Sequence, residues 1–295
     1  MSEDLIGGIE LGGTKGVALV ARGRNILACH RVPTTMPGKT LTALADWLRE
    51  QHIETPLAAL GVASFGPLGL DRTAADYGFI TQTTKPGWSQ TDVLGAFKSW
   101  FSGPIGFDTD VNGPALAEAR WGAAANCSVH VYLTIGTGVG GGLVVNGTPV
   151  HGLVHPEMGH VRVRRVAGDA FTGMCPFHGD CLEGLVSGPA LAARTGIRGE
   201  EITPDHPVWQ YVAQEIAELM VTLILIASPQ RILIGGGVGM GQPFLFPMIR
   251  DATDARLQNY VAGLDRATLD TLIIPPALGD QAGPLGAIAL GISVI

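Results

Sequence analysis

Two matching runs of apolar residues dominate the hydrophobic pattern of the chain. Residues 5–20 read LIGGIELGGTKGVALV, and residues 130–145 read HVYLTIGTGVGGGLVV. Each run passes from a β-rich stretch through a Gly/Thr turn into a second β-rich stretch, which predicts a hairpin. A third short strand is expected after each hairpin, at 26–32 and 149–152. The recurrence of this meander after about 125 residues predicts two domains of similar topology.

Helices and buried strands alternate along the rest of the chain. Leu41, Leu44 and Leu48 fall on one face of a helix predicted over Thr40–Gln51. Further helices are predicted at 91–101, 111–121, 188–195, 207–226, 242–260 and 282–292. Buried strands are predicted at 57–64, 104–108, 232–234 and 272–275. Strands that alternate with helices in each half indicate the α/β class.

The boundary between the two domains is expected near Gly113–Leu116. This interpretation divides the chain into a small N-terminal α/β lobe at 1–113 and a larger C-terminal α/β lobe at 114–281. The last helix, within 282–295, is expected to pack back on the first lobe.

The overall composition is that of a globular chain with little affinity for nucleic acid. The 295 residues are 46% hydrophobic and 15% charged, which allows a substantial core. The 42 glycines are about twice the usual share and indicate many tight turns. The formal net charge is −7, and the three arginines at 162, 164 and 165 fit a solvated strand face. We therefore expect no nucleic-acid partner.

Cysteine usage and apolar run length bear on the compartment. Cys29 and Cys127 are solitary and are expected in the core, so a reduced, cytoplasmic setting is favoured over a disulfide framework. A strand pattern begins within about five residues of Met1, so no signal peptide is expected. The longest apolar run, Leu219–Ser228, is about half the length that spans a bilayer and predicts a buried helix.

Four strong metal ligands lie within 155–183, in the stretches HPEMGH and CPFHGDCLEG. They are His160, Cys175, His178 and Cys181. The compact Cys-x2-His-x2-Cys spacing with a histidine ahead of it predicts a tetrahedral zinc site of Cys2His2 type. Four protein ligands leave no open position, so this zinc is expected to hold structure and not to activate water. The same argument counts against a zinc hydrolase.

Two glutamates, Glu157 and Glu183, frame this zinc segment. A carboxylate accepts hydrogen bonds from two hydroxyl groups with defined geometry, so the pair suits a polyol held on a metal-braced loop. Pairing of the same glutamates with nearby arginines is the alternative, and the sequence leaves both open.

Gly/Thr turns lie at the tips of the two hairpins, as Gly12-Gly13-Thr14-Lys15 and Gly136-Thr137-Gly138. Glycines permit positive φ and bring backbone N–H groups close to a ligand, which favours an anion such as phosphate. A plain hairpin turn explains either one alone, whereas two equivalent turns suggest a clamp for one polyphosphate. Neither turn matches the Walker or dinucleotide pattern. Glu10, just before the first turn, is either a magnesium-side carboxylate acting through water or a solvated strand residue.

The segment Asp108-Thr109-Asp110-Val111-Asn112 stands at a predicted strand-to-helix junction. A carboxylate there is well placed as a general base at the edge of a cleft. An aspartate at the start of a helix also serves as an N-cap. Spacing alone leaves both roles open for Asp110.

Taken together, these motifs resemble the ROK sugar kinases of the actin-like, hexokinase-like superfamily, over essentially the whole chain. GGIELGGTK resembles the first phosphate motif, TIGTGVGGG the second and LIGGGV the adenosine motif. DTDVNGPALAEARWG resembles the catalytic segment, and HPEMGH with CPFHGDCLEG the zinc and sugar signature. The resemblance implies a two-lobed, ribonuclease H-like α/β fold with an internal duplication and a zinc-binding loop.

The resemblance also implies roles for single residues. Asp110 would be the general base, Asn112 would shape the sugar site, and Glu157, His160 and Glu183 would contact the sugar. The ATP phosphates would be surrounded by Gly12, Gly13, Thr14, Lys15, Gly136, Thr137 and Gly138, and the adenosine by Gly235, Gly236 and Gly237. The implied cofactors are ATP, Mg²⁺ near Glu10 and structural Zn²⁺, and the implied assembly is a homodimer.

Within the family, the chain is most similar to the bacterial fructokinases, which implies formation of fructose 6-phosphate. YGFITQTTKPGW, Met158 and His178 carry this similarity, and Thr109 replaces an asparagine that helps glucokinases hold glucose. A kinase for mannose, glucose or an N-acetyl amino sugar is the alternative. A sugar-sensing repressor is less favoured, because the first strand is expected near Leu5, with no helix-turn-helix ahead of it, and the net charge is −7.

Overall fold

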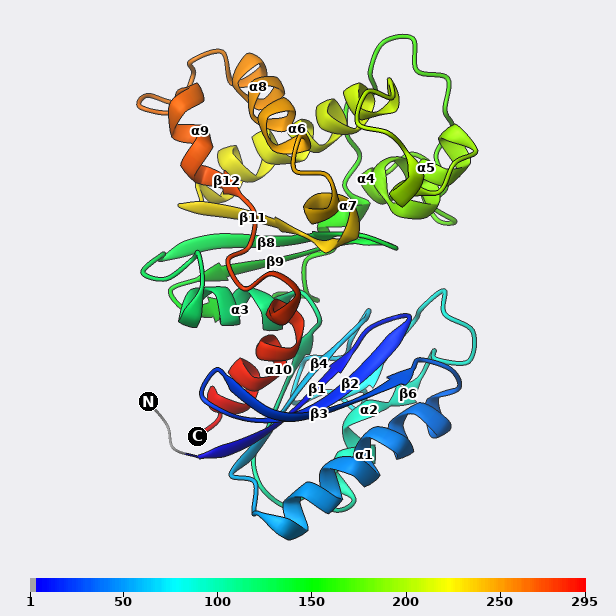
Figure 1. Cartoon of the computed structure of the whole chain (residues 1–295), viewed down its shortest axis with the longest axis vertical. Helices are drawn as coiled ribbons and strands as arrows, with labels where there is room; N and C mark the ends of the chain where they lie inside the picture. Colours follow the sequence, from blue (N-terminus) through cyan, green and yellow to red (C-terminus); the bar gives the residue numbers. More distant parts are fainter. Residues whose placement is uncertain (1–3) are drawn as a thin grey trace. The chain divides into compact units, whose positions relative to one another are not determined.

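The computed structural model describes residues 4–295, which form two compact units (Figure 1). The first unit takes in the chain up to Ala125, together with Thr148–Pro156 and Asp280–Ile295. The second unit consists of Asn126–Gly147 and Glu157–Gly279. Each unit contains strands and helices in alternation, so the α/β class is confirmed.

The first unit is built on a five-stranded sheet with the order β3-β2-β1-β4-β7. Its strands are β1 (Leu5–Leu11), β2 (Lys15–Arg22), β3 (Asn25–Pro33), β4 (Ala59–Ser64) and β7 (Ile105–Thr109). The first three form the predicted antiparallel meander, and β4 and β7 continue the sheet in parallel with β1. A separate pair, β5 (Phe79–Ile80) and β6 (Thr91–Asp92), forms a small ribbon.

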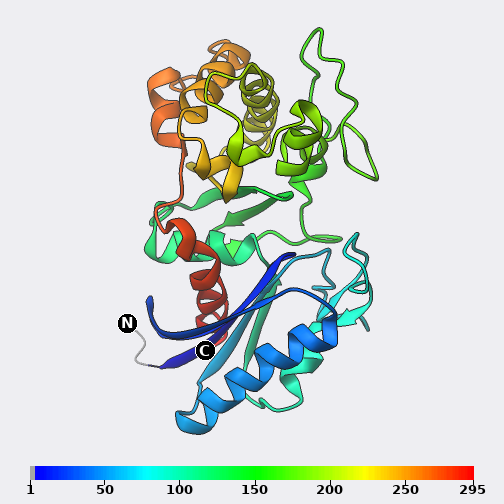
Figure 2. The ribbon, with the colours of Figure 1, turned by 45° about the vertical axis from the view of Figure 1, so that its right-hand side comes forward.

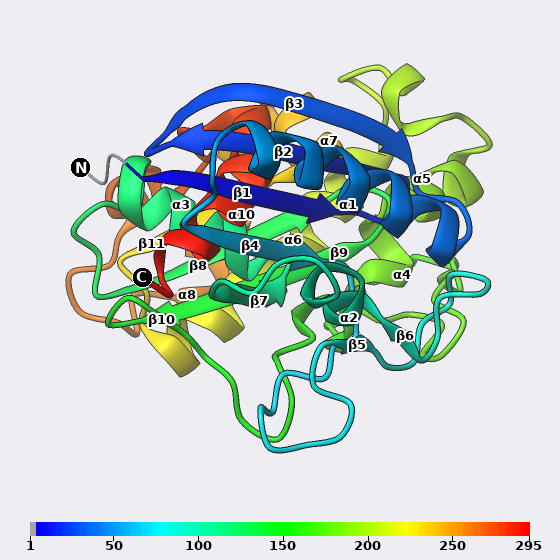
Figure 3. The same ribbon diagram turned by 90° about the horizontal axis from the view of Figure 1, so that it is seen from below.

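Helices cover both faces of this sheet (Figures 1 and 3). They are α1 (Pro37–Glu54), α2 (Val93–Lys98), α3 (Asn112–Trp121) and α10 (Ala282–Ile292). Alternate residues of β2 enter different cores: Val20 packs with the α1 face, whereas Leu19 packs with the α10 face. Glycines allow α10 to lie close to the sheet, since a Cβ on Gly61 would stand 1.8 Å from the Ala287 carbonyl oxygen.

The contacts of α3 move the domain boundary away from its predicted place. Gly286 in α10 approaches the start of α3 so closely that a Cβ there would lie 2.5 Å from the Pro114 nitrogen. The whole of α3 therefore belongs to the first unit, which runs to Ala125 and not to Gly113. The prediction placed the boundary at the start of this helix because the sequence does not reveal the packing of α3 against a helix so distant in the chain.

A second five-stranded sheet repeats the same strand order, as β10-β9-β8-β11-β12, and its strands β8, β9, β11 and β12 belong to the second unit. The strands are β8 (Val129–Ile135), β9 (Val139–Val145), β10 (Thr148–Pro149), β11 (Arg231–Gly235) and β12 (Ile273–Ile274). The β8–β9 pair is antiparallel, and β11 runs parallel to both β8 and β12, as their counterparts do in the first sheet. The internal duplication expected from the two meanders is therefore present in the fold.

The helices of the second unit gather on one side of its sheet (Figures 1 and 2). They are α4 (Leu182–Val186), α5 (Gly188–Thr195), α6 (Val208–Ala227), α7 (Gly236–Gly241), α8 (Leu245–Leu257) and α9 (Arg266–Leu272). Short 3-10 turns occur at Met158–His160, Gly199–Glu201 and Gly279–Gln281. Within the described residues, α6 is the one helix long and apolar enough to span a membrane. Its Trp209, Ile216 and Met220 lie fully buried in the core. The apolar run 219–228 was expected to be buried throughout, but its Leu225 and Ile226 are 53% and 79% exposed.

The structure differs from the predicted elements at several places. The helix expected at 91–101 starts later, because Asp92 caps it by accepting a hydrogen bond from the Gly95 N–H at 2.7 Å. The Gly235–Gly237 run is not the end of a strand alone but the start of α7, where Gly236 has a φ of +81°. Helix α9 was not predicted at all, since its seven residues carry too short an apolar pattern.

Candidate active site and metal centre

The four predicted metal ligands meet at one point in the second unit. Their ligand atoms all lie within 4.8 Å of one another. The Cys175 sulfur is 3.7 Å from Nδ1 of His160 and 3.6 Å from Nδ1 of His178, and the Cys181 sulfur is 3.5 Å from Nδ1 of His160. A tetrahedron with zinc–nitrogen and zinc–sulfur bonds of ordinary length has nitrogen–sulfur edges of about 3.6 Å. The spacing of the donors therefore fits zinc.

The chemistry of the donor set also fits a cation. Burial raises the pKa of the Cys181 thiol to about 11, and the neighbouring Cys175 sulfur acts in the same direction. A thiolate forms here at neutral pH only when a cation offsets its charge. Arg162 and Arg165 lie on the same loop and contact Asp180, between His178 and Cys181. Both arginines thus form ion pairs with Asp180.

The two glutamates of the zinc segment lie near each other. Partial desolvation by the surrounding protein, together with the Glu183 carboxylate, raises the pKa of Glu157 to about 7, although its side chain keeps an exposed surface. One oxygen of Glu183 accepts a hydrogen bond from the Val139 N–H at 3.0 Å. A raised pKa at Glu157, beside a second carboxylate, favours a ligand that donates hydrogen bonds from hydroxyl groups.

The second Gly/Thr turn stands beside the glycine run at the end of β11. Strands β8 and β11 are parallel, with Thr134 opposite Gly235, so both segments leave the same carboxyl edge of the sheet. Gly236 must be glycine, because a Cβ there would lie 2.5 Å from the Ile135 carbonyl oxygen. Ligands of open α/β sheets bind at this edge.

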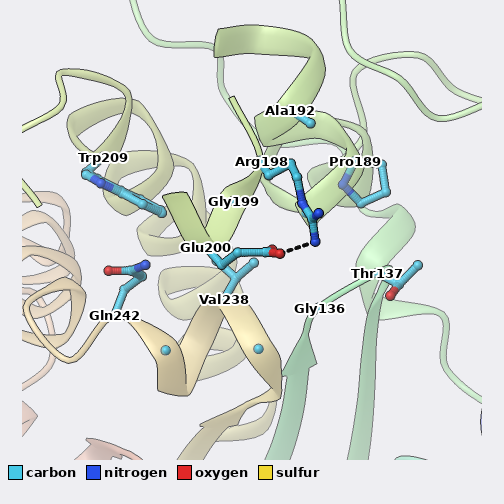
Figure 4. A pocket seen from close by; sticks show the side chains of 13 residues that line it. Gly136, Thr137, Pro189, Ala192, Arg198, Gly199, Glu200, Trp209, Val238 and Gln242 are labelled. Carbon is cyan, nitrogen blue, oxygen red and sulfur yellow. Dashed lines mark hydrogen bonds and ion pairs between the residues drawn. The ribbon is translucent and has the colours of Figure 1, made fainter. Parts of the chain in front are cut away.

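A pocket of about 580 Å³ opens at this edge (Figure 4). The Gly136–Thr137 turn and Gly237 line one side, and Pro189 and Ala192 of α5 line another. Four further lining residues were not identified from the sequence, because they come from separate elements; they are Arg198, Glu200, Trp209 and Gln242. Arg198 and Glu200 form an ion pair at the rim. The volume is that of a pocket for a nucleoside-sized ligand.

The first Gly/Thr turn is held by a residue that follows β3. The Thr34 hydroxyl donates to the Gly12 carbonyl at 2.7 Å, and the Thr34 N–H donates to the Thr14 carbonyl at 2.9 Å. Within the described residues, Gly12, Gly13, Gly136 and Gly138 do not have the positive φ that was expected. Close approach explains Gly138 instead, since a Cβ there would lie 2.8 Å from a Glu183 oxygen.

Glu10 lies on β1, two residues before Gly12 of the first Gly/Thr turn. Burial raises its pKa, and Lys15 and Arg31 partly offset that shift. A Cβ on Gly283 would stand 2.2 Å from Oε1 of Glu10, so the carboxylate reaches the first turn of α10. The structure therefore does not leave Glu10 as a solvated strand residue.

The Asp108–Asn112 junction lies at the same sheet edge as the first turn. Leu11, Ser64 and Thr109 are the last residues of β1, β4 and β7 and pair in register. The Asp110 N–H donates to the Ser64 carbonyl at 2.8 Å, which fixes the backbone just beyond that edge. Gly12 and Asp110 therefore both follow the carboxyl ends of parallel strands, where ligands of such sheets bind.

Asp110 is not the cap of α3. The helix begins at Asn112, and the Thr109 hydroxyl accepts the Asn112 N–H at 3.0 Å. Asp108 accepts the Asn112 side-chain amide at 2.7 Å and the Thr109 N–H at 2.7 Å. The helix start is thus stabilised by Thr109 and Asp108. The N-cap alternative for Asp110 is wrong, and the general-base alternative remains.

Two histidines that were not singled out from the sequence flank this junction. The His151 ring lies 3.0 Å from an Asp108 oxygen, and this contact raises the pKa of His151. Nε2 of His155 accepts the Leu68 N–H at 3.0 Å, and burial lowers the pKa of His155. Both belong to Thr148–Pro156, the segment that immediately precedes Glu157. Their partners are 43 and 87 residues away, so no local pattern marks them.

Comparison with known proteins gives a consistent result. The sequence matches the ROK family over residues 6–293. A fructokinase of Zymomonas mobilis is 43% identical over 98% of this chain and 97% of its own length. A fructokinase of Pediococcus pentosaceus is 42% identical over 97% of each chain. The crystal structure of a ROK hexokinase from Thermus thermophilus aligns with a TM-score of 0.81 at 26% identity, over 98% of each chain. The sequence match, the duplicated fold and the Cys2His2 cluster agree: the chain belongs to the ROK family.

Proposed function

We propose that this protein is an ATP-dependent fructokinase that converts D-fructose to fructose 6-phosphate in the cytoplasm. The observation that carries the proposal is the identity of about two residues in five, over almost the full length, with relatives named fructokinases. The local arrangement of the motifs supports it, because each unit presents a Gly/Thr turn at the carboxyl edge of its sheet.

Asp110 is proposed as the general base that takes the proton from the attacking sugar hydroxyl. Its backbone is fixed by the Ser64 carbonyl, and Thr109 and Asp108 stabilise the helix start in its place. Phosphoryl transfer depends on alignment and charge neutralisation more than on covalent help from the protein. A base held at a strand end by its own backbone meets the requirement for alignment.

The nucleotide is proposed to occupy the pocket of the second unit. Gly235–Gly237 would approach the adenosine, and Gly136–Gly138 with Gly12–Lys15 would bind the phosphates. Mg²⁺, when bound, neutralises charge on the transferred phosphoryl group, with Glu10 acting through water. The pocket volume of about 580 Å³ supports this assignment.

The sugar is proposed to bind through Glu157, Glu183, His160 and Asn112. The zinc held by His160, Cys175, His178 and Cys181 braces the loop that carries both glutamates. The raised pKa of Glu157, about 7, supports a site where a bound hydroxyl group shares the carboxylate charge. We also propose that the chain assembles as a homodimer, on the resemblance to ROK kinases alone.

A panel of hexoses tests the substrate. Purified protein with ATP and Mg²⁺ is assayed for ADP release with fructose, mannose, glucose and N-acetylmannosamine. We expect fructose to have the highest kcat/KM, because Thr109 replaces the asparagine associated with glucose binding. If mannose or glucose exceeds fructose tenfold, the protein is a kinase for that hexose and the fructose assignment is wrong.

A further inference from the structure

Glu183 touches the second Gly/Thr turn as well as the zinc segment. Its Oε2 accepts the N–H of Val139, the residue directly after the turn, at 3.0 Å. The same oxygen would lie 2.8 Å from a Cβ on Gly138, so the carboxylate rests against the turn itself. A residue expected to contact only the sugar therefore holds part of the loop that lines the pocket.

Helix α4, which carries Glu183, is joined closely to the metal centre. Cys181 is the N-cap of α4, and the Met174 N–H donates to the Gly184 carbonyl at 2.9 Å. A Cβ on Gly184 would lie 2.0 Å from the Gly179 carbonyl oxygen and 2.8 Å from the Cys175 nitrogen. With so little free space, α4 cannot shift unless the loop between Cys175 and Cys181 shifts with it.

The other end of α4 leads directly to the pocket. The Ser187 N–H donates to the Glu183 carbonyl at 3.2 Å, and the Gly188 N–H donates to the Gly136 carbonyl at 2.7 Å. Gly136, Gly188 and Pro189 all line the pocket. The turn is thus held at Gly136 by the start of α5 and at Val139 by Glu183, and both contacts depend on the position of α4.

We propose that α4 couples the zinc centre to the nucleotide pocket, and that Glu183 is a positioning residue for the second phosphate turn. The inference rests on the proposed function in taking a nucleotide as the ligand of the pocket. A turn whose N–H groups are already oriented binds a polyphosphate without first losing conformational freedom. Loss of either the metal or the Glu183 contact leaves the turn less ordered before the ligand arrives.

The test measures nucleotide binding with no sugar present. A nonhydrolysable ATP analogue with Mg²⁺ is titrated into the full-length protein by calorimetry. Glu183→Ala is expected to weaken binding about tenfold, the effect of losing one hydrogen bond to a charged group. Glu183→Gln keeps an accepting oxygen and is expected to stay within about threefold of wild type. Glu50→Ala is the matched control, because Glu50 is an exposed glutamate of α1 in the first unit and should leave nucleotide binding unchanged.

A second arm varies the metal. Protein purified without chelator is expected to hold one zinc per chain. Zinc removal, with the fold checked by circular dichroism, is expected to weaken the analogue about tenfold, and added zinc restores affinity. In Glu183→Ala, zinc removal is expected to add little, because both changes release the same turn. Hydrogen exchange of the Val139 amide should be faster both in Glu183→Ala and in zinc-free wild-type protein. This measurement tests the order of the turn directly, even where a variant is too unstable for calorimetry.

The outcomes separate the two proposals. Wild-type protein that binds no ATP analogue overturns the nucleotide assignment and the coupling with it. Wild-type protein that binds the analogue, while Glu183→Ala and zinc-free protein bind it within twofold of wild type, overturns the coupling alone. In that case Glu183 acts only at the sugar and zinc only as a local brace.

Discussion

The two Gly/Thr turns occupy equivalent places in two copies of one meander, yet they are held by different parts of the chain. The first turn is anchored by Thr34, which follows the third strand of its own meander. The second turn is anchored by Glu183 and Gly188, which come from the zinc segment and the helices after it. The hairpin is thus the same in both copies, whereas its turn is held by a residue of the same meander in one copy and by the zinc segment in the other.

This difference separates the properties that should depend on zinc from those that should not. Asp110 and the first turn share the carboxyl edge of the first sheet, remote in sequence from the metal ligands. The second turn and the pocket of the second unit are tied to α4. Variants in the first unit should therefore act independently of the metal, and variants around α4 should not.

The largest expected effect is that of Asp110→Asn. The asparagine side chain cannot accept the hydroxyl proton, so kcat for the sugar should fall about 10²- to 10⁴-fold. The affinity of the variant for the ATP analogue should stay within about twofold of that of wild-type protein in the same metal state, whether zinc is bound or removed. The measurement is a steady-state assay of ADP release combined with calorimetry.

Asp46→Asn serves as the control, because Asp46 is an exposed residue of α1 in the same unit, paired with Arg49. It should leave kcat unchanged. An Asp110→Asn enzyme that keeps more than about a tenth of wild-type turnover would show that another group accepts the proton.

A smaller effect is expected for Thr34→Val, which removes the side-chain hydrogen bond to Gly12 but preserves the shape of the side chain. Loss of one such bond costs about 0.5–1.5 kcal/mol, which corresponds to nucleotide binding about 2- to 12-fold weaker. Because Thr34 acts only on the first turn, this loss should multiply with the loss caused by zinc removal.

The control for Thr34 is Thr271→Val, where the hydroxyl bonds only to the exposed Thr268 carbonyl. It should bind the nucleotide as wild type does. If the effects of Thr34→Val and zinc removal overlap instead of multiplying, the two turns share an anchor and the comparison drawn above does not hold.

The smallest expected effects are on stability and have opposite pH dependence in one segment. His151 has a raised pKa in the folded chain, so its contribution to stability is full below its ordinary pKa and is lost as pH rises through the folded value. His155 has a lowered pKa, so its contribution is present above its ordinary pKa and is lost as pH falls through the folded value. His151 is half-exposed, so its pairing with Asp108 should contribute less than about 1 kcal/mol.

Urea unfolding of His151→Gln and His155→Gln at pH 5.5 and pH 8 measures both contributions. His151→Gln should cost more stability at pH 5.5 than at pH 8, and His155→Gln should cost more at pH 8. If both variants lose more stability at the same pH, the result contradicts the contacts of His151 with Asp108 and of His155 with the Leu68 N–H.

Much of the candidate site was accessible from the sequence because its motifs are local. The zinc ligands Cys175, His178 and Cys181 span seven residues, and their spacing alone predicts a cluster that the structure confirms. The two meanders were recognisable from strand period and turn residues, and the fold shows both. The role of Asp110 was not decided by spacing, because an aspartate at a helix start suits a cap or a base.

The sequence by itself determined the α/β class, the duplication, the metal centre and the two Gly/Thr turns, since each depends on residues within one or two neighbouring elements. Only the tertiary structure decided that Thr109, and not Asp110, accepts the Asn112 N–H at the start of α3. It also decided that α3 belongs to the same unit as α10 and that Glu183 accepts the Val139 N–H. Glu183 and Val139 are 44 residues apart, and Leu68 and His155 are 87 apart. Such contacts form because packing of helices on a sheet brings distant segments together, and no local periodicity records which ones will meet.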